Sequence, residues 1–279
     1  MIILSDCITE KVDEGCLKVA NNLIKKIKEK NPDTLVISYK NKPKYSDLHL
    51  KLNKLFLNVS LLSVIREKRE TLLYIPFASN TMASIVRTCV LSRMARGKVK
   101  VLFAVRFSMN KVAKKILQKS NAQIIALSKE SYEFYSTEIG ANVIYLKTGV
   151  DTSRFVPVGI EKKKELREKY KVDQNKKVLL HVGHLKMGRN VDKLLNISED
   201  YHILLVVSSV TEIDLQLKQK LNERSNITIF DMYLEHIEEI YQMADVYLFP
   251  VQERENCIDI PLSVLEAAAC NIPDRKSVV

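Results

Sequence analysis

Short β-branched runs alternate with segments of helical periodicity along the chain, and this alternation limits the fold more than any other feature. An apolar repeat of two predicts strands, and a repeat of about 3.6 predicts amphipathic helices. Strand–helix alternation indicates doubly wound parallel sheets with helices on both faces. We predict strands at residues 2–5, 34–39, 72–77, 100–105, 123–127, 142–145, 177–182, 202–207, 226–230 and 245–249, and helices at residues 15–28, 81–96, 111–119, 129–139, 215–221, 236–243 and 263–269.

This many strand–helix units predict two sheets rather than one. A chain of 279 residues, of which 46% are apolar, can bury a substantial core. The alternation stops at residues 149–164, where glycine, proline and a run of charges replace it. We therefore predict an α/β protein with a first domain at residues 1–150, a linker at 151–164 and a second domain at 165–273.

Positive charge is concentrated in the first predicted domain. The net charge of +11 divides into +14 for residues 1–150 and −3 for residues 151–279. No acidic residue occurs between Glu70 and Glu130. One half of the protein therefore carries the positive field. We predict no nucleic-acid partner, because the stretch lacks interleaved aromatic residues, glycine-rich loops and any known nucleic-acid module.

The N-terminus and the cysteines indicate a cytoplasmic protein. The apolar run before Asp6 is too short for a signal peptide or a membrane span, and no later run approaches one. The cysteines lack the spacing of a metal site, so we expect buried thiols in a reducing cytosol. They are Cys7, Cys16, Cys89, Cys257 and Cys270.

The segment after residue 245 combines features that suit a nucleotide-sugar site. An apolar run at residues 246–250 leads into a loop with Glu253 and Glu255, and a helix at residues 263–269 contains Glu266. The end of a strand and the start of the next helix form the usual ligand crevice of an open α/β sheet. Free amides and the positive helix end there favour a phosphate, whereas a carboxylate can bind sugar hydroxyls.

Four segments together resemble the family 4 glycosyltransferases. NVIYLKTGVDTSRFVPV resembles the family's "NGVD…F.P" linker, and VLLHVGHLKMGRNVDKLL resembles its "VGRL…KG…LL" phosphate loop. ITIFDMYLEHIEEIYQMADVYLFPVQE is similar to the "G…EEL..LY..ADV.L.PS..E" passage, and PLSVLEAAACNIP to "P..LEAMACG.P". They cover most of residues 142–273 in the family's order. The resemblance implies the GT-B architecture, two Rossmann-like domains facing across a cleft.

The resemblance also implies a retaining, metal-independent transfer from a nucleotide-diphosphate sugar, with no cofactor. Protein cations must then stabilise the leaving diphosphate. Gly183 is the glycine of the phosphate loop, but His184 replaces the arginine that follows it in the family. Arg189 occupies the position of the family's lysine and can clamp phosphate oxygens. Lys186 is the candidate for the missing charge, because His184 is a cation only if the diphosphate holds its pKa up.

Glu266 matches the second glutamate of the family's Glu-seven-residues-Glu motif, which binds the donor ribose. Leu265 accompanies it in the predicted donor-binding helix. The alternative for Glu266 is a helix-start electrostatic role. The position of the first motif glutamate holds Ile258, so the contact to the donor sugar, and the catalytic carboxylate, falls to Asp259 or Glu255.

The first predicted domain departs further from the family. Gly15 sits where the family's backbone approaches the donor diphosphate, or is an ordinary helix-start glycine. Arg106 stands where many members place a histidine that contacts the donor sugar. It can bind a phosphate or the acceptor instead.

Basic amphipathic helices in the acid-free stretch predict where the acceptor binds. Such helices often lie on anionic membranes, which suggests a lipid-linked or polysaccharide acceptor presented at the inner membrane face. The alternative is that their apolar faces are core and their cations only solubilise the surface. The candidate acceptor or membrane residues are Arg87, Arg93, Arg106, Lys114 and Lys115.

The last residues, Asp274–Val279, back-translate to a common sequencing-library adapter followed by a stop. We therefore expect a non-native tail after Pro273 and an incomplete second domain. A missing strand would leave a sheet edge and a core face uncovered, so we expect this chain to be marginally stable and inactive.

Three functions fit the sequence. The leading one is a glycosyltransferase, and the alternative is a non-catalytic GT-B protein that binds a nucleotide sugar or glycan. A GT-B epimerase is the third, but the linker and the LEAAAC helix favour the transferase.

Overall fold

The computed structural model describes residues 1–40, 43, 45–56, 58–105, 109, 111–186, 188–209, 211–251 and 257–276. The chain divides into two compact units, each with its own parallel sheet. The first unit comprises residues 1–12, 16–148 and 258–260, and the second comprises residues 13–15, 149–257 and 261–279.

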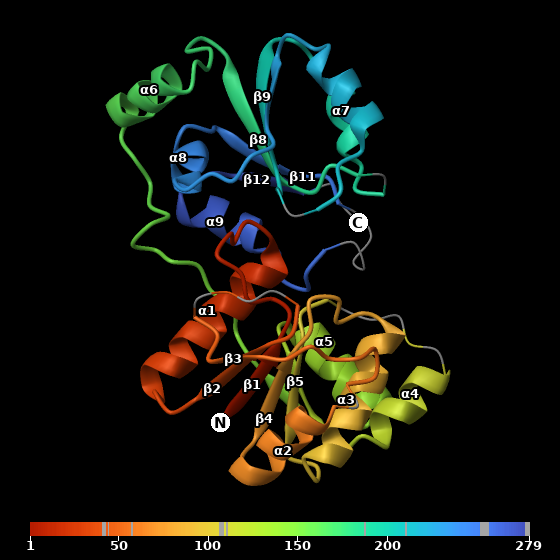
Figure 1. Cartoon of the computed structure of the whole chain (residues 1–279). Coiled ribbons are helices and arrows are strands. Elements are labelled where there is room, and N and C mark those ends of the chain that lie inside the picture. The colour runs from red at the N-terminus through yellow and green to blue at the C-terminus, as the bar shows by residue number, and fades with distance from the viewer. Residues whose placement is uncertain are drawn as a thin grey trace. The chain divides into compact units, whose positions relative to one another are not determined.

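The sheet of the first unit has the strand order β3-β2-β1-β4-β5-β6-β7, with all neighbours parallel (Figure 1). The order reverses between β1 and β4, the switch point at which open α/β sheets bind ligands. The strands are β1 (Ile2–Ser5), β2 (Leu35–Ser38), β3 (Leu48–His49), β4 (Leu72–Ile75), β5 (Val99–Phe103), β6 (Gln123–Ala126) and β7 (Val143–Tyr145).

Helices α2, α3 and α5 of the first unit begin at polar caps. Asn58, Thr81 and Ser128 each accept a hydrogen bond from the backbone amide three residues later, which satisfies a free donor of the first turn. The last helix continues as the π-helical turn η1 (Phe134–Glu138). The helices are α1 (Gly15–Lys30), α2 (Val59–Lys68), α3 (Met82–Met94), α4 (Lys111–Gln118) and α5 (Lys129–Glu133).

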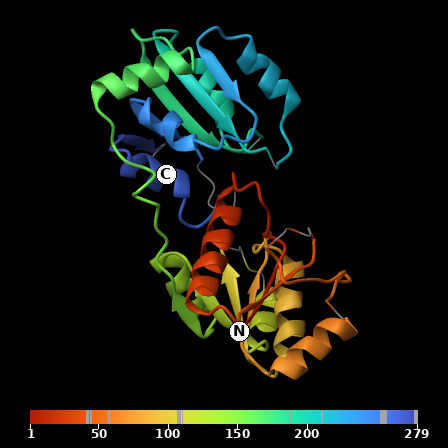
Figure 2. The same ribbon diagram turned by 60° about the vertical axis from the view of Figure 1, so that its left-hand side comes forward.

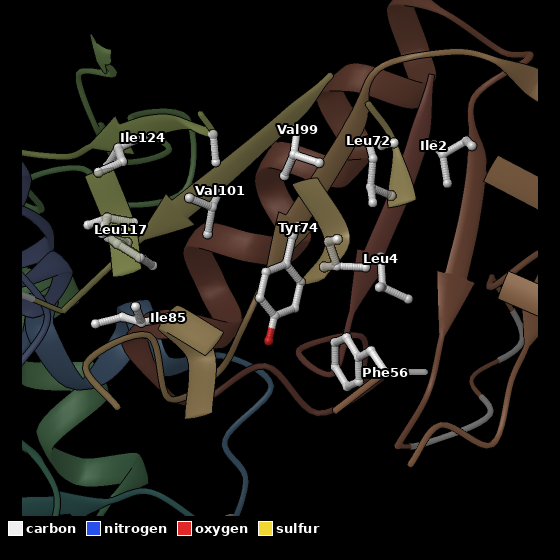
Figure 3. Close-up of a cluster of buried hydrophobic side chains, with 14 of the residues drawn as sticks. Ile2, Leu4, Phe56, Leu72, Tyr74, Ile85, Val99, Val101, Leu117 and Ile124 are labelled. Carbon is white, nitrogen blue, oxygen red and sulfur yellow. The ribbon is translucent and has the colours of Figure 1, made fainter. Parts of the chain in front are cut away.

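The core of the first unit lies between its sheet and its helices. In Figure 3 side chains from β1, β4, β5 and β6 gather on one side of the sheet. Phe56 packs edge-on against Tyr74, with ring centroids 5.6 Å apart. Ile85 of α3 and Leu117 of α4 close the same cluster. Strands covered on both faces are expected to be almost continuously apolar, as β1 and β4 are.

The sheet of the second unit has the strand order β10-β9-β8-β11-β12, again parallel throughout. Its strands are β8 (Lys177–Gly183), β9 (Tyr201–Val207), β10 (Ile227–Phe230), β11 (Val246–Phe249) and β12 (Asp274–Lys276). Its helices are α6 (Ile160–Lys169), the 3-10 helix η2 (Val191–Asn196), α7 (Leu215–Asn222), α8 (Ile237–Gln242) and α9 (Leu262–Ala269).

Both faces of the second sheet are covered. Val178 and Leu180 of β8 pack into one cluster with α6 and α8, whereas Leu179 between them packs into another cluster with α7 and η2. Successive side chains of a strand point to opposite faces, so the clusters lie on opposite sides. Figures 1 and 2 show α6 and α7 on the two sides of this sheet.

Asp245 ties α6 to the second sheet. Its carboxylate accepts hydrogen bonds from Lys163 Nζ at 2.6 Å, Arg167 Nη2 at 2.7 Å and the Val178 amide at 2.7 Å. Burial raises the pKa of Asp245, but these hydrogen bonds lower it more, so the net shift is downward. The carboxylate is therefore held in its charged form between α6 and β8.

The predicted alternation is present, and the strands expected from the sequence occur with ends shifted by up to two residues. Several elements differ from the prediction, among them the 3-10 helix η2, which was not predicted. The two-residue β3 and helix α2 were not predicted, although Asn58 is a recognisable cap for α2. Helix α6 begins at Ile160, inside the predicted linker, because its charged run is helical.

The backbone of Asp274–Lys276 forms β12, which pairs parallel with β11. The sequence predicted no element there. Backbone pairing does not depend on side-chain identity, so the predicted origin of this segment stays a prediction.

Candidate functional site

The site in the second unit begins at the carboxyl end of β8, where Gly183 leaves no room for a side chain. A Cβ there would lie 3.0 Å from His181 Nε2 and 3.6 Å from Arg189 Nη1. The His181 ring cannot easily retreat, because it is buried and its Nδ1 donates to the Leu248 carbonyl at 2.8 Å. A glycine at this position therefore lets the backbone and Arg189 approach each other closely.

Burial also sets the charge of His181. It lowers the pKa of His181 to about 4, opposed by the hydrogen bond to Leu248 and assisted by the Arg189 charge. His181 is therefore neutral, with its proton on Nδ1, and it packs against Gly183 rather than supplying a charge.

The loop after Gly183 is held at the same edge of the sheet as the end of β11. Asn190 Nδ2 donates to the Pro250 carbonyl at 3.1 Å, and the Asp214 amide donates to the Leu185 carbonyl at 2.9 Å. Leu185 is fully buried, and Gly188 turns the chain with a φ of 84°. The carboxyl ends of parallel strands are where open α/β sheets bind ligands.

His184 is not a cation in this structure. Burial, together with the nearby charges of Arg189 and Lys186, lowers the pKa of His184 to about 3. The cations of the described loop are therefore Arg189, which is partly buried, and Lys186, which is exposed.

Glu266 lies on α9 with only 4% of its surface exposed. The sequence predicts that a carboxylate buried among small apolar residues needs a partner. Tyr241 of α8 supplies one within the protein, since its hydroxyl donates to Glu266 Oε2 at 2.8 Å. Leu265, its neighbour on α9, is partly buried.

Asp259 belongs to the first unit. Its backbone amide donates to the Ala104 carbonyl at 2.8 Å, just beyond β5. Its Oδ2 atom is buried and has no hydrogen-bond partner among the described residues. The predicted role of Asp259 as the catalytic carboxylate stays a prediction. Glu253, Glu255 and Arg106 lie outside the described residues.

Residues 162–273 match the family model described as "Glycosyl transferases group 1". The matched segment lies within the second unit, apart from residues 258–260, and contains both the Gly183 loop and Glu266. The segment is therefore similar to the group 1 glycosyltransferases, and we call it the group 1 domain. The chain thus carries an enzyme domain of the transferase class, and the group 1 domain holds the strongest candidate site residues.

Solved structures resemble nearly the whole chain. HepE of Anabaena in complex with UDP-glucose has a TM-score of 0.72 at 15% identity, over 99% of this chain and 79% of that chain. Sucrose-phosphate synthase of Thermosynechococcus elongatus has 0.71 at 14%, over 100% and 81%. WaaG, a glycosyltransferase involved in lipopolysaccharide biosynthesis, has 0.68 at 13%, over 99% and 80%. Identities this low show the fold alone, which is GT-B. No curated protein matches the sequence significantly.

The candidate residues outside the group 1 domain are scattered. Gly15 is the first residue of α1 and is partly buried. Arg87 makes its contacts within the first unit. Its Cζ lies 4.9 Å from the centroid of the Phe56 ring, and its Nε donates to the Lys54 carbonyl at 3.0 Å. Lys114 lies 3.6 Å from Glu138. Arg93 and Lys115 are exposed.

The apolar faces of the two basic helices are part of the core. Ile85, Cys89 and Leu91 of α3 are buried, as are Ala113 and Leu117 of α4. The predicted membrane contact of these helices therefore depends on their exposed cations and on the exposed Val112, because the apolar side chains just named are buried in the core. None of the helices in the described part of the chain is long and apolar enough to cross a bilayer.

Three residues that shape the group 1 site were not singled out from the sequence as site residues. They are His181, Asn190 and Tyr241. Asn190 has a positive φ of 54°, which is common for asparagine in a turn, so its place in the loop could have been suspected. Nothing in the sequence pairs Tyr241 with Glu266, because they lie on different helices.

Proposed function

We propose that this protein is a retaining, metal-independent glycosyltransferase of family 4 that moves a sugar from a nucleotide-diphosphate donor to a glycan or lipid-linked acceptor. The observation that carries the proposal is the approach of Arg189 to Gly183 at the carboxyl edge of a parallel sheet, inside a group 1 domain. A guanidinium beside an open backbone suits a diphosphate.

Each residue of the site has a role in this proposal. Arg189 clamps phosphate oxygens, Lys186 adds a second charge at the rim, and Gly183 lets the backbone approach the diphosphate. His184, being neutral, donates a single N–H. Glu266 accepts hydrogen bonds from the ribose hydroxyls. HepE was solved with UDP-glucose, which makes a UDP-sugar the first donor to test.

Binding of the donor tests the proposal directly. Thermal shift and calorimetry with UDP-, GDP- and ADP-sugars should detect one donor class. Arg189→Ala and Glu266→Ala should each weaken its binding by about tenfold or more, because charged hydrogen bonds are lost. Lys220→Ala, which removes an exposed cation from α7, is the matched control and should leave binding unchanged. Binding of no nucleotide sugar would reject the proposal.

Metal independence has its own experiment. Transfer by protein expressed from the native gene should persist in excess EDTA, because cations of the protein stabilise the leaving diphosphate. Loss of transfer in EDTA, restored by Mg²⁺ or Mn²⁺, would contradict this part of the proposal.

The neutral His184 favours a second candidate, a GT-B protein that binds a nucleotide sugar or glycan without turning it over. A site with an imidazole in place of a guanidinium stabilises a leaving diphosphate less. Turnover decides between the two. Protein expressed from the native gene should transfer sugar, and Glu266→Ala and Arg189→Ala should abolish transfer. Donor binding with no turnover would establish the second candidate.

The proposal includes acceptor binding by the first unit at the inner face of an anionic membrane. Arg93 and Lys115 are exposed cations, and Val112 on α4 is 59% exposed. Liposome sedimentation should show binding that requires acidic lipid, and Lys115→Glu should weaken it more than Lys220→Glu. Equal binding to neutral and acidic liposomes would contradict the membrane contact.

A further inference from the structure

Tyr241 is held rigidly in the core of the second unit. It is fully buried on α8. Its ring meets Phe155 edge-on at 5.6 Å and stacks on Tyr247 of β11 at 6.0 Å. A tyrosine has only two side-chain torsions, and these contacts restrict both. Its hydroxyl is therefore a donor at a defined point in space.

That hydroxyl is directed at Glu266. It donates to Oε2 at 2.8 Å, a normal length for a strong hydrogen bond between oxygens. Burial, with the nearby Glu266 carboxyl adding to it, raises the pKa of Tyr241 well above its ordinary value. The phenol therefore keeps its proton throughout the physiological range and remains a donor.

We propose that Tyr241 is a positioning residue that holds the Glu266 carboxyl in the orientation that receives the ribose hydroxyls of the donor. This inference rests on the proposed function of Glu266. A carboxylate has two oxygens with about four lone-pair sites, and Tyr241 occupies one of them. Two adjacent hydroxyls can both donate to a carboxylate only when its orientation and position are fixed. The hydrogen bond from a rigidly held phenol fixes both.

The physical reason is the freedom of the glutamate side chain. It has three rotatable bonds, and small errors in the position of a binding group are costly. A merely structural Tyr241 would tie α8 to α9 and would affect stability alone. A positioning Tyr241 also affects how strongly the site distinguishes ribose from a sugar without hydroxyls.

Tyr247 provides a matched control. It is fully buried and belongs to the same stack, but its hydroxyl donates to the Val182 carbonyl at 3.2 Å. Tyr247→Phe and Tyr241→Phe therefore each remove one buried hydroxyl from the same aromatic stack. Only Tyr241→Phe removes the bond to Glu266.

The experiment compares UDP with 2′,3′-dideoxy-UDP by calorimetry, with the GDP and ADP pairs run in parallel. Wild-type protein should bind the ribose form about tenfold more tightly. Tyr241→Phe should reduce this ratio to about two or less, mainly by weakening the ribose form, because the dideoxy form does not use Glu266. Tyr247→Phe should keep the wild-type ratio, and Glu266→Gln should lose it.

The outcomes separate the two proposals. If Glu266→Gln loses the preference for ribose while Tyr241→Phe keeps it, Tyr241 is structural and only this inference falls. If wild-type protein binds none of the nucleotides, the proposed function falls and this inference with it. If Tyr241→Phe does not fold, 4-fluorophenylalanine at position 241 fills the space of the hydroxyl without donating. That variant should lose the preference, and a wild-type ratio would overturn the inference.

Discussion

The lack of a side chain at Gly183 shapes the phosphate loop. Because a Cβ at residue 183 would lie 3.0 Å from His181 Nε2, Gly183→Ala forces the ring or the backbone to shift. The ring is pinned by its bond to Leu248, so we expect a loss of stability of about 1–2 kcal/mol in urea unfolding. Displacement of Arg189 should also weaken donor binding. Gly149→Ala, with no atom within 4 Å of its Cβ, should change neither.

The two histidines near this loop predict how stability depends on pH. The pKa of His181 is lowered to about 4 and that of His184 to about 3, both below the ordinary histidine value of 6.5. The unfolded chain therefore binds more protons, so stability is present above pH 6.5 and is lost as the pH falls toward these values. As the pH falls from 7 to 5, each histidine should lower the free energy of unfolding by roughly 1–2 kcal/mol.

Hydrogen exchange in peptides of β8 measures this loss. His184→Gln should reduce the difference in protection between pH 7 and pH 5 by the roughly 1–2 kcal/mol expected for one histidine. An unchanged difference would show that His184 becomes protonated without cost, and is therefore solvated in the native protein.

At the scale of elements, the tie between α6 and the second sheet depends on one carboxylate. Asp245→Asn keeps an acceptor for the Val178 amide but leaves Lys163 and the nearly buried Arg167 without a counter-charge. We expect a loss of about 2–3 kcal/mol in the free energy of unfolding of the second unit. The surface pair of α6, Lys162 with Glu165, is the control, and Glu165→Gln should cost under about 0.5 kcal/mol.

Element prediction succeeded where patterns were local. The runs at β8 and β9 are buried on both faces, and their apolar continuity is visible in the sequence. It failed at α6, because a run of lysine and glutamate resembles a solvated linker. The amphipathic pattern of α4 was visible, but whether its apolar face meets a membrane or the core was not. Only the packing of Ala113 and Leu117 decides that.

At the scale of the whole molecule, donor binding should stabilise the unit that holds the site. A ligand at 100 times its Kd adds about 2.7 kcal/mol to the stability of the state that binds it. Hydrogen exchange with saturating UDP-sugar should therefore show protection in peptides of β8, its loop and α9. Protection absent from these peptides, but present in others, would place the donor elsewhere.

The sequence by itself determined the α/β class, the group 1 motifs, and the candidate residues Gly183, Arg189 and Glu266. These follow from local periodicity and from residue types at short spacing, which a chain displays before it folds. Only the tertiary structure decided that His184 is neutral, that Arg87 is engaged by Phe56, and that Glu266 is held by Tyr241. Burial and contacts between distant segments set those properties, and neither exists until the helices and strands pack together.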